Sequence, residues 1–316
     1  MSQSSKTILI TGGAGNIARL LAKRLLQDGH AITCLDIVEP SLADKVENVE
    51  YETADICDES RLESLLDSRK PDLIFHLASL LSGSSEVDRR RAFQINAIAS
   101  FNLLELSQKH NPSPTVVFPG TGASYGSGVP SELPETYEQW PENIYGATKV
   151  AVERLGVYYK LKHGLDFRCL RPPLVLSPFA PQSALTAYAS HAYVAAFNGK
   201  SFSFPVAPDI GMSTIYIQDL VEGFVQLAFA PKESLKQHAY NLHAFCPSAQ
   251  EVADSIKRHR PDFEYTFKPN EIVESMLRPA PNKVQDDRAR RDWGWNPRFE
   301  LDDCTKDIFE LLKKTQ

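Results

Sequence analysis

The chain has 316 residues, of which 42% are hydrophobic and 23% are charged, and its formal net charge is −6. This length is sufficient for one large α/β domain with a smaller appendage, or for two domains. A nucleic-acid surface normally shows a basic stripe, whereas Lys and Arg are scattered here, so we expect no nucleic-acid partner. The one dense basic cluster, Arg89–Arg91, is better explained as a solvated helix face than as a phosphate site.

The cysteines and the apolar runs indicate the compartment. The five cysteines are far apart, and no pair has the spacing of metal ligands or of a disulfide framework. A short polar start leads directly into the apolar run 7–10, and no run approaches the roughly 18 apolar residues that span a bilayer. We therefore expect reduced thiols, no metal site, no membrane segment and a cytoplasmic protein.

The first half of the chain alternates strand and helix signals. Short apolar runs predict strands, and apolar residues at helical spacing predict helices between them. Strands that alternate with helices in this way predict a doubly wound parallel sheet, the Rossmann arrangement, covered on both faces. The predicted strands are 7–10, 31–35, 49–53, 73–77 and 115–118, and the predicted helices are 17–27, 60–68 and 93–109.

The pattern changes after residue 144. Arg171-Pro172-Pro173 interrupts it, and proline-punctuated segments follow. We interpret residues 1–172, with a return around 212–230, as the sheet domain, and residues 173–316 mainly as a smaller α/β lobe over the carboxyl edge of the sheet. The predicted elements here are helices 144–162, 219–229, 248–258 and 303–313 and strands 166–170 and 214–217.

A glycine-rich turn, Thr11–Ala18, joins the first strand to the first helix. Gly12 and Gly15 let the backbone turn tightly and approach a phosphate without a Cβ in the way. The free N–H groups at Asn16 and Ile17, where the helix begins, would then face a pyrophosphate. The spacing Gly-x-x-Gly-x-x-Ala differs from the commoner Gly-x-Gly-x-x-Gly, and a glycine-rich turn without a ligand is the alternative.

An acidic residue strengthens the case for a dinucleotide. Asp36 ends the second strand about 20 residues later, where its carboxylate accepts hydrogen bonds from the adenine-ribose hydroxyls. A carboxylate repels a 2′-phosphate, so we expect NAD rather than NADP, and residues 1–172 become an NAD-binding domain. Asp55 and Ile56, after the third strand, are candidates for the adenine edge, although a lone Asp-Ile pair favours neither outcome.

Tyr145 and Lys149 lie four residues apart, on one face of a predicted helix. A phenol with a pKa near 10 is a poor base at neutral pH. A neighbouring ammonium and the positive nicotinamide ring both favour the phenolate, which takes the proton of a substrate hydroxyl as hydride leaves. Lys149 also reaches the nicotinamide-ribose hydroxyls. Tyr-x-x-x-Lys occurs often by chance, so a surface pair is the alternative.

Four motifs in order resemble the extended short-chain dehydrogenase/reductase family, the NAD-dependent epimerase/dehydratase superfamily. The resemblance implies that Leu77 and Ala78 lie at the cofactor and that Asn96 supports the catalytic helix. It also implies a catalytic Ser or Thr five residues before the Gly of the pair Tyr125-Gly126, which is Thr121, with nearby Ser124 as a rival. The motifs are Thr11–Ala18, His76-Leu77-Ala78, Tyr145-x-x-x-Lys149 and Leu170-Arg171-Pro172-Pro173.

Five segments carry a closer resemblance within that family: His76–Ser82, Tyr158-Tyr159, Leu165-Asp166-x-Arg168-x-Leu170-Arg171, Pro261-Asp262-Phe263 and Asp292-Trp293-Gly294-Trp295. They resemble short-chain L-threonine 3-dehydrogenases. The resemblance implies oxidation of a small 3-hydroxy acid by NAD, with Ser82 and Thr186 holding the polar groups of the substrate. Three positions depart from that group, because Ala187 stands for an Asp, Leu174 for a Gly and Ala280 for a Trp. These changes in one pocket put threonine itself in doubt. Dehydrogenases of sugar-derived hydroxy acids such as D-erythronate share the Ser82-Gly83 pair and stay candidates.

Two other readings use the same cofactor. A nucleotide-sugar epimerase or dehydratase returns the hydride within one turnover, and such relatives usually carry an Arg that binds the diphosphate four residues before Tyr216. That position is Met212, and the loss of a bidentate phosphate ligand disfavours this reading. A regulatory NAD-binding protein without turnover is disfavoured because no residue of the triad is lost. Helices 93–109 and 144–162 resemble those that pair two subunits in the family, which implies a homodimer.

Overall fold

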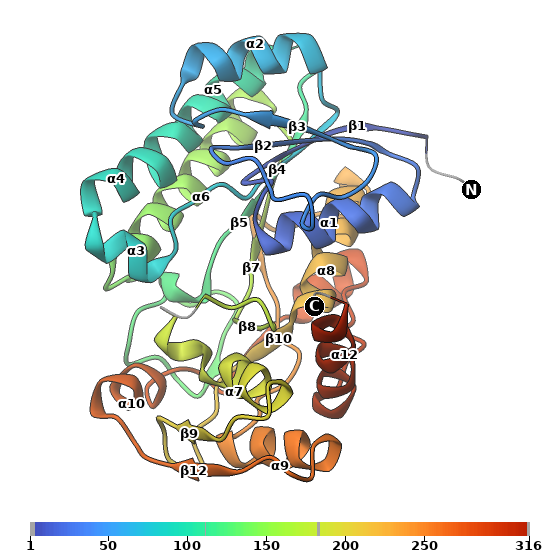
Figure 1. Ribbon diagram of the computed structural model, residues 1–316. Helices are drawn as coiled ribbons and strands as arrows, with labels where there is room; N and C mark the ends of the chain where they lie inside the picture. The colour runs from blue at the N-terminus through green and yellow to red at the C-terminus, as the bar shows by residue number, and fades with distance from the viewer. Residues whose placement is uncertain (1–3, 111, 182–183, 315–316) are drawn as a thin grey trace.

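The computed structural model describes residues 4–110, 112–181 and 184–314, and its centre is one seven-stranded sheet (Figure 1). Every strand pair in it is parallel, and the order is β11-β7-β5-β4-β1-β2-β3. This confirms the predicted doubly wound parallel sheet. The strands are β1 Thr7–Thr11, β2 Ala31–Asp36, β3 Val49–Thr53, β4 Leu73–His76, β5 Thr115–Pro119, β7 Phe167–Arg171 and β11 Ala239–Asn241.

Helices cover both faces of this sheet, as Figure 1 shows. On one face α1 (Asn16–Gln27) and α8 (Ile217–Phe229) bury their apolar side chains against β1, β4 and β5. On the other face α2 (Glu59–Arg69), α5 (Ser100–Lys109) and α6 (Ile144–His163) form a second apolar cluster. With both faces covered, the inner strands are buried, and the carboxyl edge is the open side where loops can build a site.

The predicted helix 93–109 is correct in kind but differs in two details. The helical segment begins earlier, with α4 (Arg89–Phe93), and it contains a π-helical turn, Gln94–Ala99, before α5. The hydroxyl of Ser100 donates to the carbonyl of Asn96 at 2.8 Å. In a regular α-helix this carbonyl accepts from the backbone N–H of Ser100, so the hydroxyl competes with the backbone for it. A π turn of this kind leaves no signal in hydrophobic periodicity, and it often marks a functional site.

The second half of the chain contributes to both parts of the molecule. Helix α8 lies on the sheet, and β11 adds the seventh strand at its edge. No sequence pattern indicated β11, because three residues are too few to show alternation. The predicted strand 214–217 is β10 (Thr214–Tyr216), which pairs with β8 (Leu174–Leu176) outside the main sheet. The domain boundaries at residues 172 and 173 stay a prediction.

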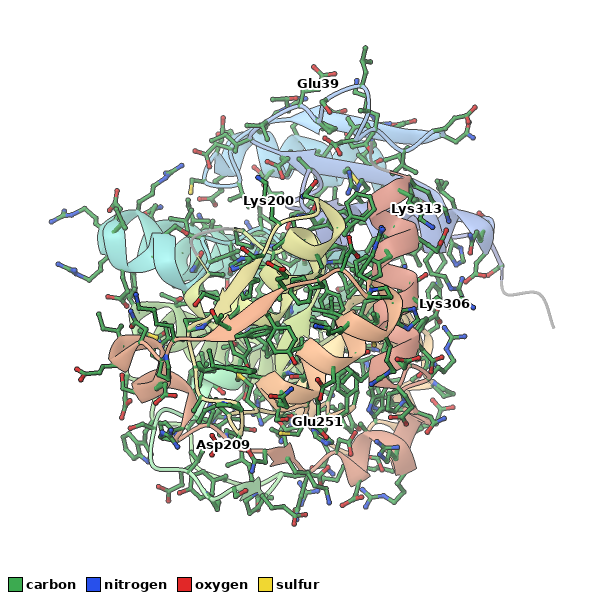
Figure 2. The ribbon with its side chains drawn as sticks, turned by 60° about the horizontal axis from the view of Figure 1, so that its bottom comes forward. Glu39, Lys200, Asp209, Glu251, Lys306 and Lys313 are labelled. Atoms are coloured by element: carbon green, nitrogen blue, oxygen red, sulfur yellow. The ribbon has the colours of Figure 1, made fainter. Side chains whose placement is uncertain are left out.

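A smaller lobe lies beyond the carboxyl edge of the sheet, at the bottom of Figure 1, around its own apolar cluster. Figure 2 looks onto this lobe and shows charged side chains of both signs around it: Lys306 and Lys313 on α12, Glu251 on α9 and Asp209 in the loop before β10. Within the described residues, none of the helices has the length and apolar character needed to cross a membrane. The lobe elements are α7 Tyr188–Phe197, α9 Ala249–His259, α10 Glu271–Leu277, α12 Leu301–Lys313, β9 Phe202–Phe204 and β12 Tyr265–Phe267.

The remaining short elements lie in the connections. Strand β6 (Glu132–Leu133) pairs with β13 (Lys283–Val284), and α3 (Ser82–Val87) packs against α6. These connections bring segments that are far apart in the sequence to the same edge of the sheet. The others are α11 Asp287–Trp293 and the 3₁₀ helices Gly122–Ser124, Leu185–Ala187 and Lys232–Ser234.

Candidate active site

The glycine turn follows β1 directly and ends where α1 begins. Gly12 has φ +71°, and a Cβ there would lie 2.8 Å from the backbone nitrogen of Ala78. A Cβ on Gly13 would collide with the side chain of Cys34, whereas the nearest neighbour of a Cβ on Gly15 is a carbonyl oxygen at 3.1 Å. The sequence placed the glycine requirement on Gly12 and Gly15. The packing of the chain adds Gly13 to this pair, and Gly15 is the N-cap of α1, where no side chain caps the helix.

Asp36 stands beside this turn at the end of β2. Its Oδ2 accepts a hydrogen bond from the backbone N–H of Ala14 at 3.0 Å, and its Oδ1 accepts one from Val38 at 3.2 Å. These bonds hold the carboxylate against the turn and still leave lone pairs for a further donor. The structure therefore brings the predicted ribose ligand to the predicted phosphate turn.

Asp55 and Ile56 are engaged within the protein itself. Asp55 accepts a hydrogen bond from the backbone N–H of Cys57 and forms an ion pair with Arg91 at 2.7 Å. The bond from Cys57 is the main reason why the pKa of Asp55 is lowered. Ile56 is buried in the apolar cluster under α2 and α5. Arg91 is thus more than part of a solvated helix face, and contact of Asp55 and Ile56 with an adenine stays a prediction.

Leu77 and Ala78 leave the end of β4 alongside the turn. The backbone N–H of Leu77 donates to the carbonyl of Thr11 at 3.1 Å, and that of Ala78 donates to the hydroxyl of Thr11 at 3.2 Å. Because Gly12 also approaches Ala78 closely, the ends of β1 and β4 form one backbone surface beside the start of α1.

Asn16 and Arg19, in the first turn of α1, contact the lobe. The amide of Asn16 donates to the carbonyl of Phe179 at 3.1 Å, and the guanidinium of Arg19 lies 5.0 Å from the ring centre of Phe179. The side chain of Asn16 is therefore engaged by the lobe.

Tyr145 lies in the first turn of α6, whose N-cap is the side chain of Asn143. Burial raises the pKa of Tyr145 to about 12, and a hydrogen bond with Thr121 lowers it in part. The hydroxyl of Thr121 also accepts from the backbone N–H of Ala123 at 3.1 Å. The rival Ser124 is buried, and its hydroxyl has no partner in the described part of the chain. The structure thus brings Thr121, not Ser124, to the phenol.

Lys149 is 3% exposed, one turn further along α6. Its Nζ lies 4.6 Å from the ring centre of Phe118 and 5.6 Å from that of Tyr145, and it has no hydrogen-bond partner among the described residues. Burial lowers the pKa of Lys149 to about 8. A buried ammonium without an acceptor is costly, so this group fits a ligand that supplies hydroxyl oxygens. Together with the close backbone approach at Gly12, it makes the residues present a fit for a nicotinamide dinucleotide.

Asn96 supports the start of α6, as expected from its position. Its amide accepts from the backbone N–H of Leu80 at 2.8 Å, donates to the carbonyl of Leu80 at 3.0 Å and reaches the hydroxyl of Thr148 at 3.4 Å. Thr148 in turn donates to the carbonyl of Tyr145 at 2.8 Å. The backbone of the tyrosine is therefore tied to the loop that follows β4.

A buried polar network behind the site was not predicted. The guanidinium of Arg171 binds the carboxylate of Glu153 through two nitrogens, and it donates to the hydroxyl of Tyr125 at 3.0 Å. Tyr125 donates to Asn241 on β11 at 2.7 Å. The signal was present in part, because Glu153 continues the four-residue spacing of Tyr145 and Lys149 along α6. The network joins α6, β7 and β11 to the loop that carries Thr121.

The predicted substrate residues lie on short elements. Ser82 is exposed at the start of α3, and Glu86 of that helix accepts from the backbone N–H of Ile144, next to Tyr145. Thr186 is half-buried in the 3₁₀ helix Leu185–Ala187, which packs against α10. In the described residues no hydrogen bond joins Ser82 or Thr186 to Thr121 or Tyr145, so their contact with a substrate stays a prediction.

Comparison with known proteins identifies the family of this chain. The NAD dependent epimerase/dehydratase family matches residues 8–242. The mitochondrial L-threonine 3-dehydrogenase of Bos taurus is 30% identical over 304 residues, which cover 93% of this chain and 79% of that protein. The structure of L-threonine dehydrogenase from Clostridium difficile has a TM-score of 0.91 at 30% identity and covers 99% of both chains. A monomeric L-threonine 3-dehydrogenase from a metagenome has a TM-score of 0.87 at 29% identity, with 97% of this chain and 99% of that chain covered.

The fold and the site define an enzyme that works with a nicotinamide dinucleotide. The chain belongs to the NAD-dependent epimerase/dehydratase family of extended short-chain dehydrogenases/reductases. It is an NAD-dependent dehydrogenase or epimerase, which confirms the family that the sequence motifs indicated.

Proposed function

We propose that this enzyme oxidises the hydroxyl of a small 3-hydroxy acid, threonine-like or derived from a sugar acid, with Tyr145 as the base. The observation that carries the proposal is the buried group of Thr121, Tyr145 and Lys149 beside the glycine turn. Bound NAD supplies the hydride acceptor. Everything else that the reaction needs comes from side chains at the carboxyl edge of the sheet.

The proton leaves the substrate hydroxyl through Tyr145. Burial makes the phenol a weaker acid, and its pKa stays raised to about 12 with the hydrogen bond to Thr121 included, so the phenolate needs nearby stabilisation. The hydrogen bond of Thr121 contributes in this direction, and so does the positive charge of Lys149, whose Nζ lies 5.6 Å from the ring centre. In this arrangement Thr121 orients the substrate oxygen and Lys149 binds ribose hydroxyls, with its charge kept near the phenol.

Asp36 favours NAD over NADP. Its carboxylate is fixed at the end of β2 by two backbone N–H groups. Ile37 and Val38, which follow it, are exposed and carry no charge that would bind a 2′-phosphate. A phosphate placed beside a fixed carboxylate is repelled, so we propose at least a ten-fold preference for NAD, or about 1.4 kcal/mol.

Residues of the smaller lobe favour net oxidation of the substrate over epimerisation. Met212, at the position where the related epimerases usually carry a diphosphate-binding Arg, packs against the apolar cluster of the lobe. An apolar side chain there offers no charge-assisted bond to a diphosphate. The buried Ala187 and the half-buried Leu174 and Ala280 change the shape of the same region, so the proposal names a class of hydroxy acids rather than threonine.

The test is a substrate panel. The purified protein is incubated with NAD and with 3-hydroxy acids and 2-amino-3-hydroxy acids, including threonine and D-erythronate, while NADH absorbance is followed. We expect NADH to form with at least one of them. If no acid of the panel gives NADH and a UDP-sugar is converted without net NADH, the proposed dehydrogenase activity is refuted and an epimerase activity is established.

For assembly and compartment we propose a homodimer in the cytoplasm. Exposed apolar side chains lie on the π-helical turn, α4, α5 and α6, the helices expected to pair: Phe93, Ile98, Phe101, Tyr158 and Leu161. All five cysteines are free, which suits a reducing compartment. Sedimentation velocity of the wild type and of Leu161→Glu tests the dimer: we expect a dimer that the charge dissociates, and a monomeric wild type would refute the proposal.

A further inference from the structure

His76 ends β4 and is bonded at both ring nitrogens in a buried position. Its Nδ1 lies 2.7 Å from the hydroxyl of Thr11 on β1, and its Nε2 lies 2.7 Å from the hydroxyl of Ser100 at the start of α5. All three side chains are at most 2% exposed. The imidazole thus spans the distance from the glycine turn to the helical segment that supports α6.

Counting hydrogens fixes the form of the ring. Ser100 uses its only hydroxyl hydrogen in the bond to the carbonyl of Asn96 at 2.8 Å. It can therefore only accept from His76, so Nε2 carries the hydrogen. In a neutral ring Nδ1 then accepts, and Thr11 is its donor. The hydroxyl oxygen of Thr11 in turn accepts from the backbone N–H of Ala78. Each bond in the chain from Ala78 to Asn96 has one possible direction.

The ring stays neutral because its surroundings disfavour the cation. Burial, followed by the positive charge of Lys149, lowers the pKa of His76 to about 3. A cationic ring would also carry a hydrogen on Nδ1, and the hydroxyl of Thr11 would then have to accept from Nδ1 instead of donating to it. Phe118 and Ser100, which also contact the ring, carry no charge.

The two ends of this chain meet different parts of the site. At one end Thr11 and Ala78 border Gly12, where the backbone has no room for a side chain. At the other end Asn96 clamps Leu80 and reaches Thr148, which bonds to the carbonyl of Tyr145. A change at His76 therefore moves the cofactor turn relative to the catalytic tyrosine.

We propose that His76 is a positioning residue whose neutral Nε2–H form fixes the spacing between the dinucleotide turn and the start of α6. The inference requires the binding of a nicotinamide dinucleotide but not a particular substrate, so it holds for a dehydrogenase and for an epimerase. Two substitutions of His76 separate the contributions of its two hydrogen bonds. Asn at position 76 keeps an acceptor where Nδ1 lies and loses the donor, whereas Gln keeps a donor where Nε2 lies and loses the acceptor.

The first experiment is imidazole ¹⁵N NMR of the full-length wild type labelled at histidine, with His76→Asn used to assign the signal. We expect one histidine in the Nε2–H form, unchanged between pH 6 and pH 9. An Nδ1–H form, or an imidazolium in that range, would overturn the proposal even if every variant failed to fold.

The second experiment compares NADH binding, by fluorescence, with hydrogen exchange of residues 94–99. We expect His76→Gln and Thr11→Val each to weaken NADH binding roughly ten-fold, and His76→Asn to stay within about three-fold. The Gln variant leaves the hydroxyl of Thr11 without its acceptor, and the Val variant leaves Nδ1 of His76 and the N–H of Ala78 without their partner. His76→Asn should instead speed exchange in residues 94–99, which His76→Gln leaves protected. Thr33→Val is the matched control: this buried threonine of β2 has no hydroxyl partner in the described residues, and we expect NADH affinity to be unchanged. Equal NADH affinity and equal exchange in the Asn and Gln variants would refute the assignment of the two ends.

Discussion

The cofactor side and the substrate side of this site are built differently. Thr11, Asp36 and Ala78 lie at the ends of neighbouring strands in one sheet, and each is hydrogen bonded to the turn or to another strand end. Ser82 and Thr186 lie on helices of six and three residues, without such bonds to the proposed catalytic residues in the described part of the chain. The sheet fixes the chemistry that the family shares, and short elements leave the choice of substrate open to change.

The largest effect is expected at the glycine turn, where the sheet leaves no freedom. Gly12→Ala places a Cβ against Ala78 at a positive φ, so we expect unfolding free energy to fall by about 2–4 kcal/mol and NADH affinity to fall roughly 100-fold. Gly29→Ala is the control, because Gly29 has φ +82° but open space around it. It should cost about 1 kcal/mol and leave NADH affinity unchanged. Equal effects of the two changes on NADH affinity would contradict close approach as the cause.

A second test removes the buried charge on the cofactor side. The pKa of Lys149 is lowered to about 8, so the folded state holds fewer protons than the unfolded state between pH 8 and the usual lysine range. Its burial therefore destabilises the fold most at pH 7, and less as pH rises through this window. We expect Lys149→Met to raise the unfolding free energy by about 1–3 kcal/mol at pH 7, with the gain shrinking towards pH 10, while turnover is lost.

Urea unfolding of both proteins at pH 7, 8.5 and 10 measures this difference. Taking the difference between the two proteins cancels the titration of the buried cysteines and tyrosines, which both proteins share. A variant that is less stable than the wild type at pH 7 would show that Lys149 is paired within the protein rather than held for a ligand.

The fold and the cofactor half of the site were predictable because local rules act there. Strand periodicity, a positive φ at Gly12 and an acidic residue after β2 leave signals in short stretches of sequence. Thr121 required the family pattern, since a lone hydroxyl residue carries no signal of its own. The network of Glu153, Arg171 and Asn241 was missed because its members meet only through the packing of α6 on β7 and the pairing of β7 with β11.

The substrate half was less predictable for a physical reason. Strand β11 has three residues, and the lobe pairs β8 with β10 and β9 with β12 from segments of the same length. Such segments give periodicity little to act on. The run at 214–217 still predicts the strand β10, whereas no pattern indicates β8, β9, β11 or β12. The π-helical turn arose from one hydroxyl, that of Ser100, competing with the backbone.

The smallest effects are expected on the substrate side. Thr186→Val keeps the shape of the side chain and removes one hydroxyl, so we expect the KM for the substrate to rise roughly three- to thirty-fold with kcat nearly unchanged. Ser82→Ala, at an exposed position, should raise it by about three-fold or less. Steady-state kinetics of both variants, on the substrate found with the panel, provide the measurement. A large loss of NADH affinity in either variant would show that the two sides are not separate.

The proposed mechanism depends on Tyr145 acting as the base beside a bound dinucleotide. Tyr145→Phe removes one hydroxyl and leaves the turn, Asp36 and Lys149 in place. We expect NADH binding, measured by fluorescence, to stay within about two-fold of the wild type, while turnover falls by at least about 100-fold. Turnover close to that of the wild type in Tyr145→Phe would contradict the proposed mechanism directly.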